Sequence, residues 1–521
     1  MATYKLAAII RNSTNTDEFV LVKQTPPPKY DDQEYDSYAD SDLWDLPSAK
    51  LTSLSPEVDS STQFVLQGEE ACPHNLNLRK FDLRSAVSEV LGQVGFGSAS
   101  AIQWKFLKFM EEPNFGPGFI NTVYVTGDLL PETLKDHCQW SSNKSCTDLL
   151  LQVKPGTDRI GPLVVNSLLK DPMPSHSFKL PPTLSSQEYP LGVNIVPMGS
   201  YTAPPFQTTN LIVFTSGNNH VQYEDGDFIA HGDAMIVDPG CRSEFNKELA
   251  EIVAALPRKL IVFVTHHHRD HVEGLSTVQK TNPDACLLAH ENTISRIRKD
   301  DWSLGCTKVS GTEEICIGGE RFRIIFAPGH TDGHLALLHV STNSLIAGDH
   351  CVGKGSAFLD IKSGGNMSDY FQTTYKFLDL SPNALISMHG RVNLWPKHML
   401  CGYLKNRRSR ESTILKAIEA GSKTLFDIIS YTYADVDRSL WIHAASNVRL
   451  HVEHLALHNK LPEEFSVRKF ESTCTVHFFS RWMWSYFQKH VSYPTLMLFG
   501  AVTASGIALL YSARNSLLGM L

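Results

Sequence analysis

The 521-residue chain lacks the features that mark several large classes of protein. Its ten cysteines are scattered and form no CxxC pair, which argues against a disulfide framework and is typical of reduced thiols in a cytosol-facing protein. No long apolar run follows a basic start at the N-terminus, so no signal peptide is evident. A net charge of −8 argues against a surface that binds polyanions in general, although it allows a local basic patch.

The length of 521 residues suggests three or four units, at about 100–200 residues per domain. Residues 1–185 form the first predicted unit, α/β in pattern, with a polar surface loop at 24–42. A proline-rich link leads into a second unit at 190–402, where short apolar runs such as AMIVDPG and KLIVFVT alternate with helical patterns. Residues 403–470 are helical in pattern and form a third unit. No internal repeat is visible.

One long uncharged run lies near the C-terminus, at residues 493–511 (YPTLMLFGAVTASGIALLY). Its length matches the roughly 30 Å of a bilayer core, and the preceding segment RWMWSYFQKH combines aromatic and basic residues. The run predicts a transmembrane tail anchor in an intracellular membrane, with the rest of the chain facing the cytosol. The sequence does not identify that membrane. The alternative is a buried C-terminal helix, since Gly500 and Gly506 dilute the run.

The densest group of chemically active residues is THHHRDHVEG, at 265–274. It follows the predicted strand KLIVFVT, and loops at the ends of buried strands often carry function. His266 and His268 can point the same way from an extended segment, with His267 turned aside. Asp270 and His271 are then free to serve a second ion nearby. Imidazole and carboxylate together suit zinc or a similar metal.

Further candidate ligands follow three later apolar runs, each directly after a predicted strand. His330 follows RFRIIF, Asp349 follows the run that ends in LIAG, and His389 follows ALISM. A zinc ion needs more than two ligands, so these positions complete the set that the first cluster begins. Four strand ends in series, each with a ligand type, predict one metal site.

This order of residues resembles the HxHxDH–H–D–H signature of the metallo-β-lactamase superfamily, over roughly residues 195–400. The resemblance implies an αβ/βα sandwich and a site for two zinc ions per chain. It assigns His266, His268 and His330 to the first ion, Asp270, His271 and His389 to the second, and Asp349 as the bridge. The sequence departs from the family at Glu273, where a glycine is common, and around His389, which lacks the usual PGHGP context.

Two ions at such a site lower the pKa of water and polarise a carbonyl or phosphoryl oxygen, so hydrolysis needs no nucleophile from the protein. Asp270 is the candidate catalytic residue, because it can also orient the attacking water. Weaker candidates surround the ligands, and among them His334 is expected to support a ligand rather than bind metal. The other weaker candidates are His267, Arg269, Glu273 and His350.

The helical unit at 403–470 resembles the C-terminal winged helix of the lactamase-beta-like endoribonuclease group. Together with PGHTDGHLALL it implies cleavage of single-stranded RNA. A basic cluster is expected to hold RNA phosphates, or else is a solvated helix start; it comprises Lys405, Arg407, Arg408 and Arg410. Two alternatives remain, a thioester hydrolase of the glyoxalase II type and a metal-bound RNA-binding or scaffold protein without activity. The sequence leaves the oligomeric state open.

The segment LWDLPSAKL followed by LRSAVSEVLGQVGFG resembles a Nudix domain. Glu89 keeps one acidic position of the Nudix helix, but Gly92 and Gln93 stand where two glutamates belong. One carboxylate is a poor magnesium site, so we expect a Nudix-like fold without Nudix hydrolysis. The predicted fold class is therefore α/β: a metallo-β-lactamase sandwich with an N-terminal Nudix-like domain, a C-terminal winged helix and a transmembrane helix.

Overall fold

The structure is a computed structural model, and its described residues divide into two compact units. It describes residues 2–54, 64, 66–73, 76–96, 103–130, 134–151, 154, 156–169, 180–215, 228–353 and 355–490. The first unit contains residues 1–357 and 369–404, and the second contains 358–368 and the residues from 405 onward. The last of the three boundaries, between residues 404 and 405, falls inside helix α9 (Pro396–Glu419). The predicted domain boundaries at 185 and 190 lie within the first unit and stay a prediction.

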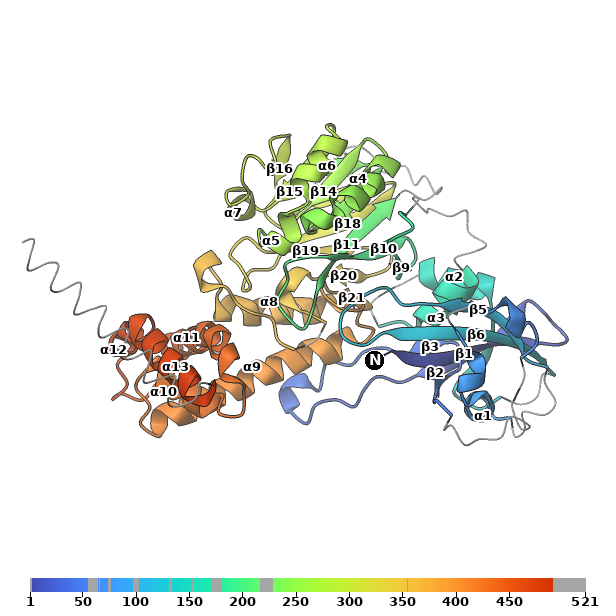
Figure 1. Ribbon diagram of the computed structural model, residues 1–521, viewed down its shortest axis with the longest axis horizontal. Helices are drawn as coiled ribbons and strands as arrows, with labels where there is room; N and C mark the ends of the chain where they lie inside the picture. Colours follow the sequence, from blue (N-terminus) through green and yellow to red (C-terminus); the bar gives the residue numbers. More distant parts are fainter. Residues whose placement is uncertain are drawn as a thin grey trace, which may run out of the picture. The chain divides into compact units, whose positions relative to one another are not determined.

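An eight-stranded sheet forms the N-terminal part of the first unit (Figure 1). Its central strand β1 (Thr3–Asn12) pairs in parallel with β6 (Ile120–Leu129), and helix α1 (Leu83–Val94) packs on one face. Asp82 caps α1 by accepting from the Ser85 amide at 3.0 Å. The other elements are β2 (Glu18–Gln24), β3 (Leu43–Asp45), β4 (Ser48–Leu51), β5 (Lys105–Met110), β7 (Cys138–Ser142), α2 (Asn143–Leu151), β8 (Arg159–Ile160) and α3 (Pro162–Val164).

Two further sheets face each other across a shared apolar core. In strand β13 (Ala234–Val237) every residue is buried, because Ala234 and Ile236 face the helices while Met235 and Val237 face the second sheet. The seven-stranded sheet contains β13, β9 (Gln187–Glu188), β10 (Val193–Gly199), β11 (Thr208–Thr215), β14 (Leu260–Phe263), β15 (Cys286–Ala289) and β16 (Cys306–Lys308). The six-stranded sheet contains β12 (Ala230–Gly232), β17 (Glu314–Ile317), β18 (Glu320–Phe326), β19 (Leu335–His339), β20 (Ser344–Ile346) and β21 (Ala384–Ile386).

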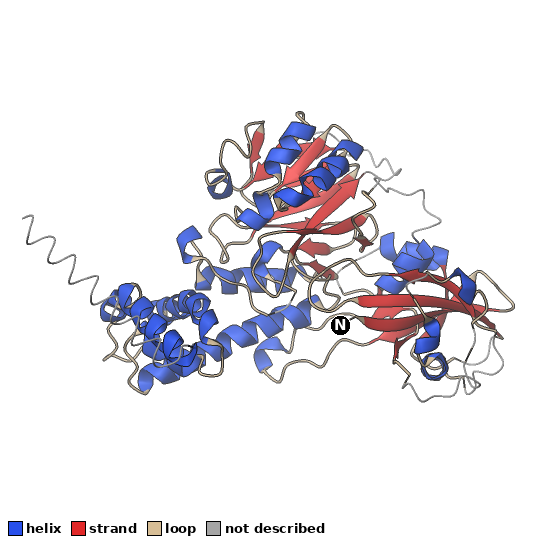
Figure 2. Cartoon of the chain, viewed as in Figure 1, coloured by secondary structure: helices blue, strands red, loops and turns tan. Residues whose placement is uncertain are grey.

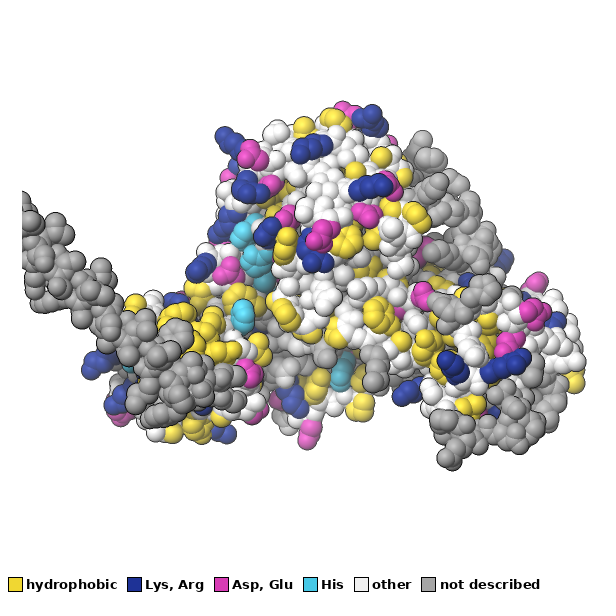
Figure 3. Space-filling view, viewed as in Figure 1, with side chains coloured by type: hydrophobic (Ala, Val, Ile, Leu, Met, Phe, Trp, Pro, Cys, Tyr) yellow, Lys and Arg dark blue, Asp and Glu magenta, His cyan; other side chains and the backbone are white. Residues whose placement is uncertain are grey.

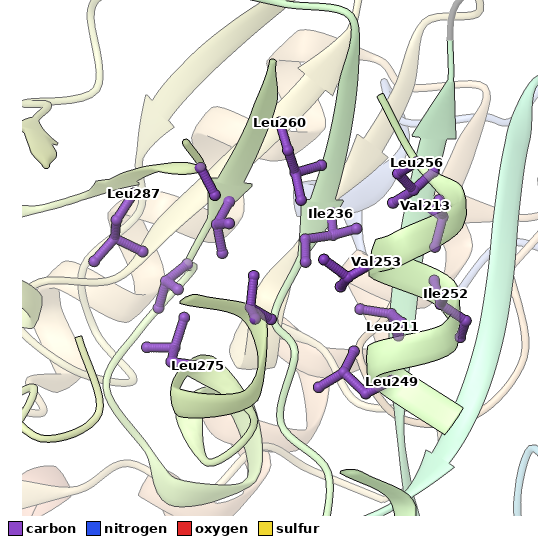
Figure 4. Close-up of a cluster of buried hydrophobic side chains, with 14 of the residues drawn as sticks. Leu211, Val213, Ile236, Leu249, Ile252, Val253, Leu256, Leu260, Leu275 and Leu287 are labelled. Atoms are coloured by element: carbon purple, nitrogen blue, oxygen red, sulfur yellow. The ribbon is translucent and has the colours of Figure 1, made fainter. Parts of the chain in front are cut away.

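Helices α4 (Asn246–Ala255) and α6 (Leu275–Thr281) cover the outer face of the seven-stranded sheet. Figure 4 shows Leu249, Ile252 and Val253 of α4 directed at the sheet residues Leu211 and Ile236. These helix residues follow the spacing that places side chains on one helical face, which is why the segment forms an amphipathic helix. Three shorter or later helices complete this part of the unit: α5 (Arg269–Val272), α7 (Glu291–Ile294) and α8 (Met367–Leu380).

The second unit consists of helices joined by loops, with no strand among the residues that the structure describes (Figure 2). The C-terminal half of α9 packs with α10 (Leu425–Thr432) and α11 (Trp441–Leu457) around a core that includes Ile414, Ile428 and Val448. Helices α12 (Val467–Ser472) and α13 (Val476–His490) add Phe470 and Phe478 to this core. The helical pattern expected for 403–470 is present, but the winged-helix and Nudix-like resemblances are not confirmed.

The predicted fold class and localisation need one correction, which concerns the membrane anchor. Within 2–490, apart from the gaps given above, no helix is both long and apolar enough to cross a bilayer. The last described helix, α13, is 15 residues long and carries Arg481 and Lys489, whereas a span needs about 20 apolar residues. This finding overturns the predicted transmembrane tail anchor and the tail-anchored localisation. Residues 493–511, on which the prediction fell, lie outside the described residues.

Arg159 joins the N-terminal sheet to the end of the six-stranded sheet. Its guanidinium donates to the carbonyl oxygens of Asn383 at 2.7 Å, Ser41 at 2.6 Å and Leu394, and it lies 4.9 Å from the centre of the Trp395 ring. Only 4 % of the residue is exposed, and this burial lowers the pKa of Arg159. One buried cation therefore satisfies carbonyl groups from two parts of the chain that are distant in sequence, at Ser41 and at 383–394.

We expect Arg159→Met to lower the free energy of unfolding by about 2–4 kcal/mol, because it leaves buried carbonyl oxygens unpaired while keeping an aliphatic stem. Denaturant unfolding of the full chain measures this loss as a lower midpoint concentration of denaturant, with an unchanged dependence of the unfolding free energy on denaturant concentration. The control is Arg79→Met, since Arg79 pairs with Glu69 at the surface with 68 % of its side chain exposed. Equal losses in the two variants would contradict the role assigned to Arg159.

Candidate metal centre

The predicted metal residues lie at one edge of the two facing sheets, each just beyond the end of a strand. His266 and His268 follow β14, Asp270 and His271 begin α5, and His330 follows β18. Asp349 follows β20 and His389 follows β21. Parallel pairing of β20 with β21 brings their carboxyl ends to the same edge. All seven predicted residues therefore meet in space, although they span more than a hundred positions of the sequence.

His266, His268 and His330 form the first ligand group. The Nε2 atom of His266 lies 3.0 Å from Nδ1 of His268 and 3.2 Å from Nε2 of His330, and the latter two atoms are 3.0 Å apart. Tetrahedral zinc with bonds of about 2.0–2.1 Å separates its nitrogen ligands by roughly 3.3 Å. The three nitrogen–nitrogen distances of this group are close to that separation, so the group suits a bound cation.

The proton on His266 is held on the nitrogen that faces away from this group. Its Nδ1 lies 3.0 Å from the Thr265 hydroxyl, which itself donates to Asp238 at 2.6 Å. The Thr265 oxygen therefore accepts from His266, and the Nε2 lone pair points at His268 and His330. Burial and then the neighbouring imidazoles hold the pKa of His266 well below its ordinary value. A neutral imidazole with a free Nε2 is the form that binds metal.

Asp270, His271 and His389 form the second ligand group. Oxygens of Asp270 lie 3.8 Å from Nε2 of His271 and 3.5 Å from Nε2 of His389. Both rings are fixed through Nδ1, which donates to Asp238 at 2.8 Å in His271 and to the Thr208 carbonyl at 2.9 Å in His389. Each ring thus presents Nε2 to the interior of the group.

Asp349 lies between the two groups. Its Oδ2 atom is 3.5 Å from Nε2 of His271 and 4.0 Å from Nε2 of His330, and its Oδ1 atom is 3.4 Å from Nε2 of His389. One carboxylate therefore faces ligand atoms of both groups. This is the arrangement that a bridge between two ions requires.

The charges of the centre also fit cations. Burial opposes ionisation of Asp349, but His389 and His271 outweigh it and hold the pKa of Asp349 well below its usual value. Burial likewise opposes protonation of His271, yet Asp349, Asp270 and Asp238 raise its pKa well above the ordinary value. Nε2 of His271 and Oδ1 of Asp349 are buried without a hydrogen bond. Divalent ions would satisfy both atoms and neutralise the carboxylates, so the residues fit a metal centre.

Sequence reasoning missed Asp238, which organises the interior of the centre. It is fully buried and accepts from the Thr265 amide at 2.8 Å, the Thr265 hydroxyl and the His271 ring. A Cβ at nearby Gly240 would lie 1.8 Å from the Asp270 carbonyl oxygen, so only glycine lets this turn pack on α5. The available signal was a carboxylate directly after a buried strand, in AMIVDPG.

The weaker candidates fall into different surroundings. His334 accepts a hydrogen bond from the Asp349 amide at 3.1 Å, so it supports a predicted ligand, as expected. Burial, and to a smaller extent the neighbouring His350, lowers the pKa of His334 to about 3. The His350 ring contacts Thr374 instead of the ligand groups. Arg269 is exposed, lies over the Tyr201 ring at 4.1 Å and donates to Glu273 at 2.5 Å. Figure 3 shows histidine side chains gathered at the surface beside α5.

His267 differs from its two neighbours in the same tripeptide. Its ring centre lies 5.1 Å from that of His268, but His267 is in none of the ligand groups found among the described residues. This agrees with the expectation that the middle histidine turns aside.

The predicted basic cluster of the helical unit is divided between surface and interior. Lys405 is exposed and Arg408 is half-buried. Arg407 is only 4 % exposed and donates to Asn447 at 3.2 Å, while Arg410 donates to the Thr432 carbonyl at 2.7 Å. Within this cluster Lys405 is exposed, Arg408 and Arg410 are half-buried, and Arg407 is buried.

In the N-terminal sheet, Gln93 takes part in packing. Its side chain accepts from the Ser48 amide at 3.2 Å and donates to the Ser48 carbonyl at 2.9 Å, which fastens α1 to β4. Glu89 is exposed. Among the residues that the structure describes, the groups able to hold an ion lie around the histidine cluster and not on α1.

Comparison with protein families gives a match to the metallo-beta-lactamase superfamily over residues 228–380. The chain contains a metallo-β-lactamase superfamily domain. The match includes every predicted metal residue except His389, which lies beyond its end. The domain is of a hydrolase family whose fold typically binds divalent metals, in agreement with the two ligand groups.

Several curated proteins are similar to the chain. A beta-lactamase-like protein 2 homolog of Drosophila melanogaster is 26 % identical over 278 residues, which cover 50 % of this chain and 86 % of that protein. A hydroxyacylglutathione hydrolase of Thermosynechococcus vestitus is 31 % identical over 138 residues, covering 26 % and 52 %. A solved beta-lactamase domain protein from Burkholderia ambifaria aligns with a TM-score of 0.44 at 18 % identity, covering 55 % of this chain and 93 % of that one.

We expect His268→Ala to lose close to one metal equivalent per chain, because it removes one of three nitrogens from the first ligand group. Elemental analysis of the metal-loaded, dialysed full chain measures the loss. The matched control is His267→Ala, which changes the adjacent histidine outside that group and should retain the wild-type metal content. Equal metal loss in both variants would contradict the assignment of ligands.

We expect Asp238→Asn to weaken metal binding about 10- to 100-fold, because the change removes the carboxylate that accepts from His271 and sets its ring orientation. Competition with a chromogenic chelator measures the affinity. Wild-type affinity in this variant would show that His271 is oriented without Asp238.

Proposed function

We propose that the chain is a hydrolase that uses two metal ions, most simply zinc, to cleave phosphodiester bonds of single-stranded RNA. The observation that carries this proposal is the position of Asp349, whose carboxylate faces Nε2 of His330 in one ligand group and Nε2 of His271 and His389 in the other. Two ligand groups that share one carboxylate support a pair of ions held close together, which is the arrangement used in many phosphodiester-cleaving enzymes.

Bound ions would lower the pKa of water and stabilise the charge that develops on the phosphoryl oxygens. The protein side chains then have two tasks. His271 and His389 hold their Nε2 atoms in place through their Nδ1 hydrogen bonds to Asp238 and the Thr208 carbonyl. Asp270 keeps 15 % of its side chain exposed, so its carboxylate can orient an attacking water and accept its proton.

RNA as substrate is supported by the resemblance of the helical unit to the winged helix of the endoribonuclease group, and by the exposed side of its first helix. Lys405 is exposed, and Arg408 is half-buried, as is Arg410. Arg407 and Arg410 are held by Asn447 and Thr432 inside that unit. We assign the proposed phosphate contacts to Lys405 and Arg408, which lie three positions apart on one face of α9.

Thioester hydrolysis is the second candidate. It is favoured by the similarity of residues in this chain to hydroxyacylglutathione hydrolases, one of which is 31 % identical over 138 residues. The metal centre serves both reactions equally well, because polarising a thioester carbonyl and a phosphoryl oxygen makes the same demand on the ligands. Only the substrate-contacting residues can separate the two candidates.

The deciding assay presents the metal-loaded full chain with a labelled single-stranded RNA and, in parallel, with S-lactoylglutathione. We expect RNA cleavage that falls at least about 100-fold in Asp270→Ala, because this variant loses the residue that orients water. Thioester turnover without RNA cleavage would replace the first candidate by the second. A chain that binds two ions and turns over neither substrate would favour the inactive scaffold.

Charge reversal refines the same assay. The double variant Lys405→Glu with Arg408→Glu should reduce RNA cleavage on the order of tenfold at moderate salt and leave any thioester turnover unchanged. The matched control reverses Lys416 and Lys423, which are also exposed in the helical unit. An equal loss in the control would indicate a general charge effect instead of a phosphate contact.

A further inference from the structure

The loop between β5 and β6, residues 111–119, leaves the N-terminal sheet and enters the core of the metallo-β-lactamase domain. Phe115 at its tip is 2 % exposed and belongs to the apolar cluster between the two facing sheets. The same cluster contains Met388, the residue directly before His389. The loop therefore ends beside the segment that carries the last predicted metal ligand.

A chain of hydrogen bonds connects this loop to the ring of His389. The hydroxyl of Thr208 donates to the carbonyl oxygen of Asn114 at 2.9 Å. The carbonyl oxygen of Thr208 accepts from Nδ1 of His389, also at 2.9 Å. A carbonyl oxygen only accepts, so this contact places the ring proton on Nδ1. Nε2 then faces Asp270, Asp349 and the Thr202 hydroxyl, the last at 3.5 Å.

A second connection runs through Arg391, two residues after His389. Its guanidinium forms a two-point ion pair with Glu112, with one contact of 2.5 Å between Nη2 and Oε2, and it also donates to the Gly118 carbonyl. Glu112 accepts from the Ile120 amide at 2.7 Å as well, which closes the base of the loop. Only 10 % of the Glu112 side chain is exposed, so solvent screens this pair weakly.

Phe206 fills the space between the loop and the histidine. Its ring stacks on that of His389 with centres 5.7 Å apart. A Cβ at Gly116 would lie 3.0 Å from the Phe206 ring, and the φ of Gly116 is +118°. Glycine at this position lets the loop approach closely enough to hold Phe206 against His389.

We propose that the loop is a positioning element for His389, and that Glu112 is its main positioning residue. The loop belongs to the N-terminal sheet, outside residues 228–380 that match the superfamily. The N-terminal region thereby sets the affinity for the ion assigned to Asp270, His271 and His389, and leaves the ion assigned to the three-histidine group unaffected. This inference rests on the proposed two-ion function.

The test uses the full chain with Glu112→Gln. Glutamine keeps an acceptor for the Ile120 amide but loses the charge that pairs with Arg391. Zinc is titrated against a chromogenic chelator so that the two binding steps are resolved. We expect one of the two steps to lose about tenfold in affinity, which is the size of effect typical of groups that orient a ligand. The other step should stay within error of the wild type.

Two further variants separate positioning from simple packing. The matched control is Glu111→Gln, because Glu111 is the neighbouring glutamate of the loop and is exposed. This variant should bind both ions with wild-type affinity. Thr208→Val removes the hydroxyl bond to Asn114 without changing any charge, and should weaken only the step that Glu112→Gln weakens. Thermal unfolding of the metal-free variants checks that they fold as the wild type does.

Selective weakening of one step in Glu112→Gln and Thr208→Val, at unchanged stability, would support the proposal. Two wild-type binding steps in both variants, or equal weakening of both steps, would overturn it and leave the loop a packing role. A wild-type chain that binds fewer than two ions would instead overturn the two-ion function. The stoichiometry of the wild type therefore tells the two failures apart.

Discussion

The burial of like charges governs the arrangement of this molecule. The carboxylates of Asp238, Asp270 and Asp349 lie within one cluster at the edge of two sheets, where water screens them weakly. Such a cluster is stable only if each carboxylate has donors or cations around it. The histidines supply them, and each histidine needs a fixed ring orientation to do so. The strands, the turn at Asp238 and the loop at Glu112 all serve that requirement.

The sequence predicts the local part of this arrangement well. Each predicted ligand comes directly after an apolar run that was expected to be a buried strand. The runs before His266, His330, Asp349 and His389 all form strands. Asp238 has the same context, but a single aspartate before Pro239 reads equally well as a turn residue. Nothing in the local pattern separates the two roles, because the partner that reveals the difference, His271, lies 33 positions away.

Long-range packing accounts for what the sequence could not predict. Arg407 stands among other basic residues in a helix, yet its guanidinium is buried against Asn447. The polar segment 24–42 reads as a surface loop, yet Asp40 in it accepts from the amides of Lys397 and His398 at the start of α9. Residue type predicted solvent in both cases, and a partner far along the chain decided otherwise.

The contact between Glu112 and Arg391 joins residues that are 279 positions apart. During synthesis the N-terminal sheet and its loop emerge before the segment that carries His389. Contacts of such separation form late because the intervening chain must first be ordered. A fragment trimmed to residues 228–380 would lack both sides of this contact. Its metal content would describe a different, incomplete centre.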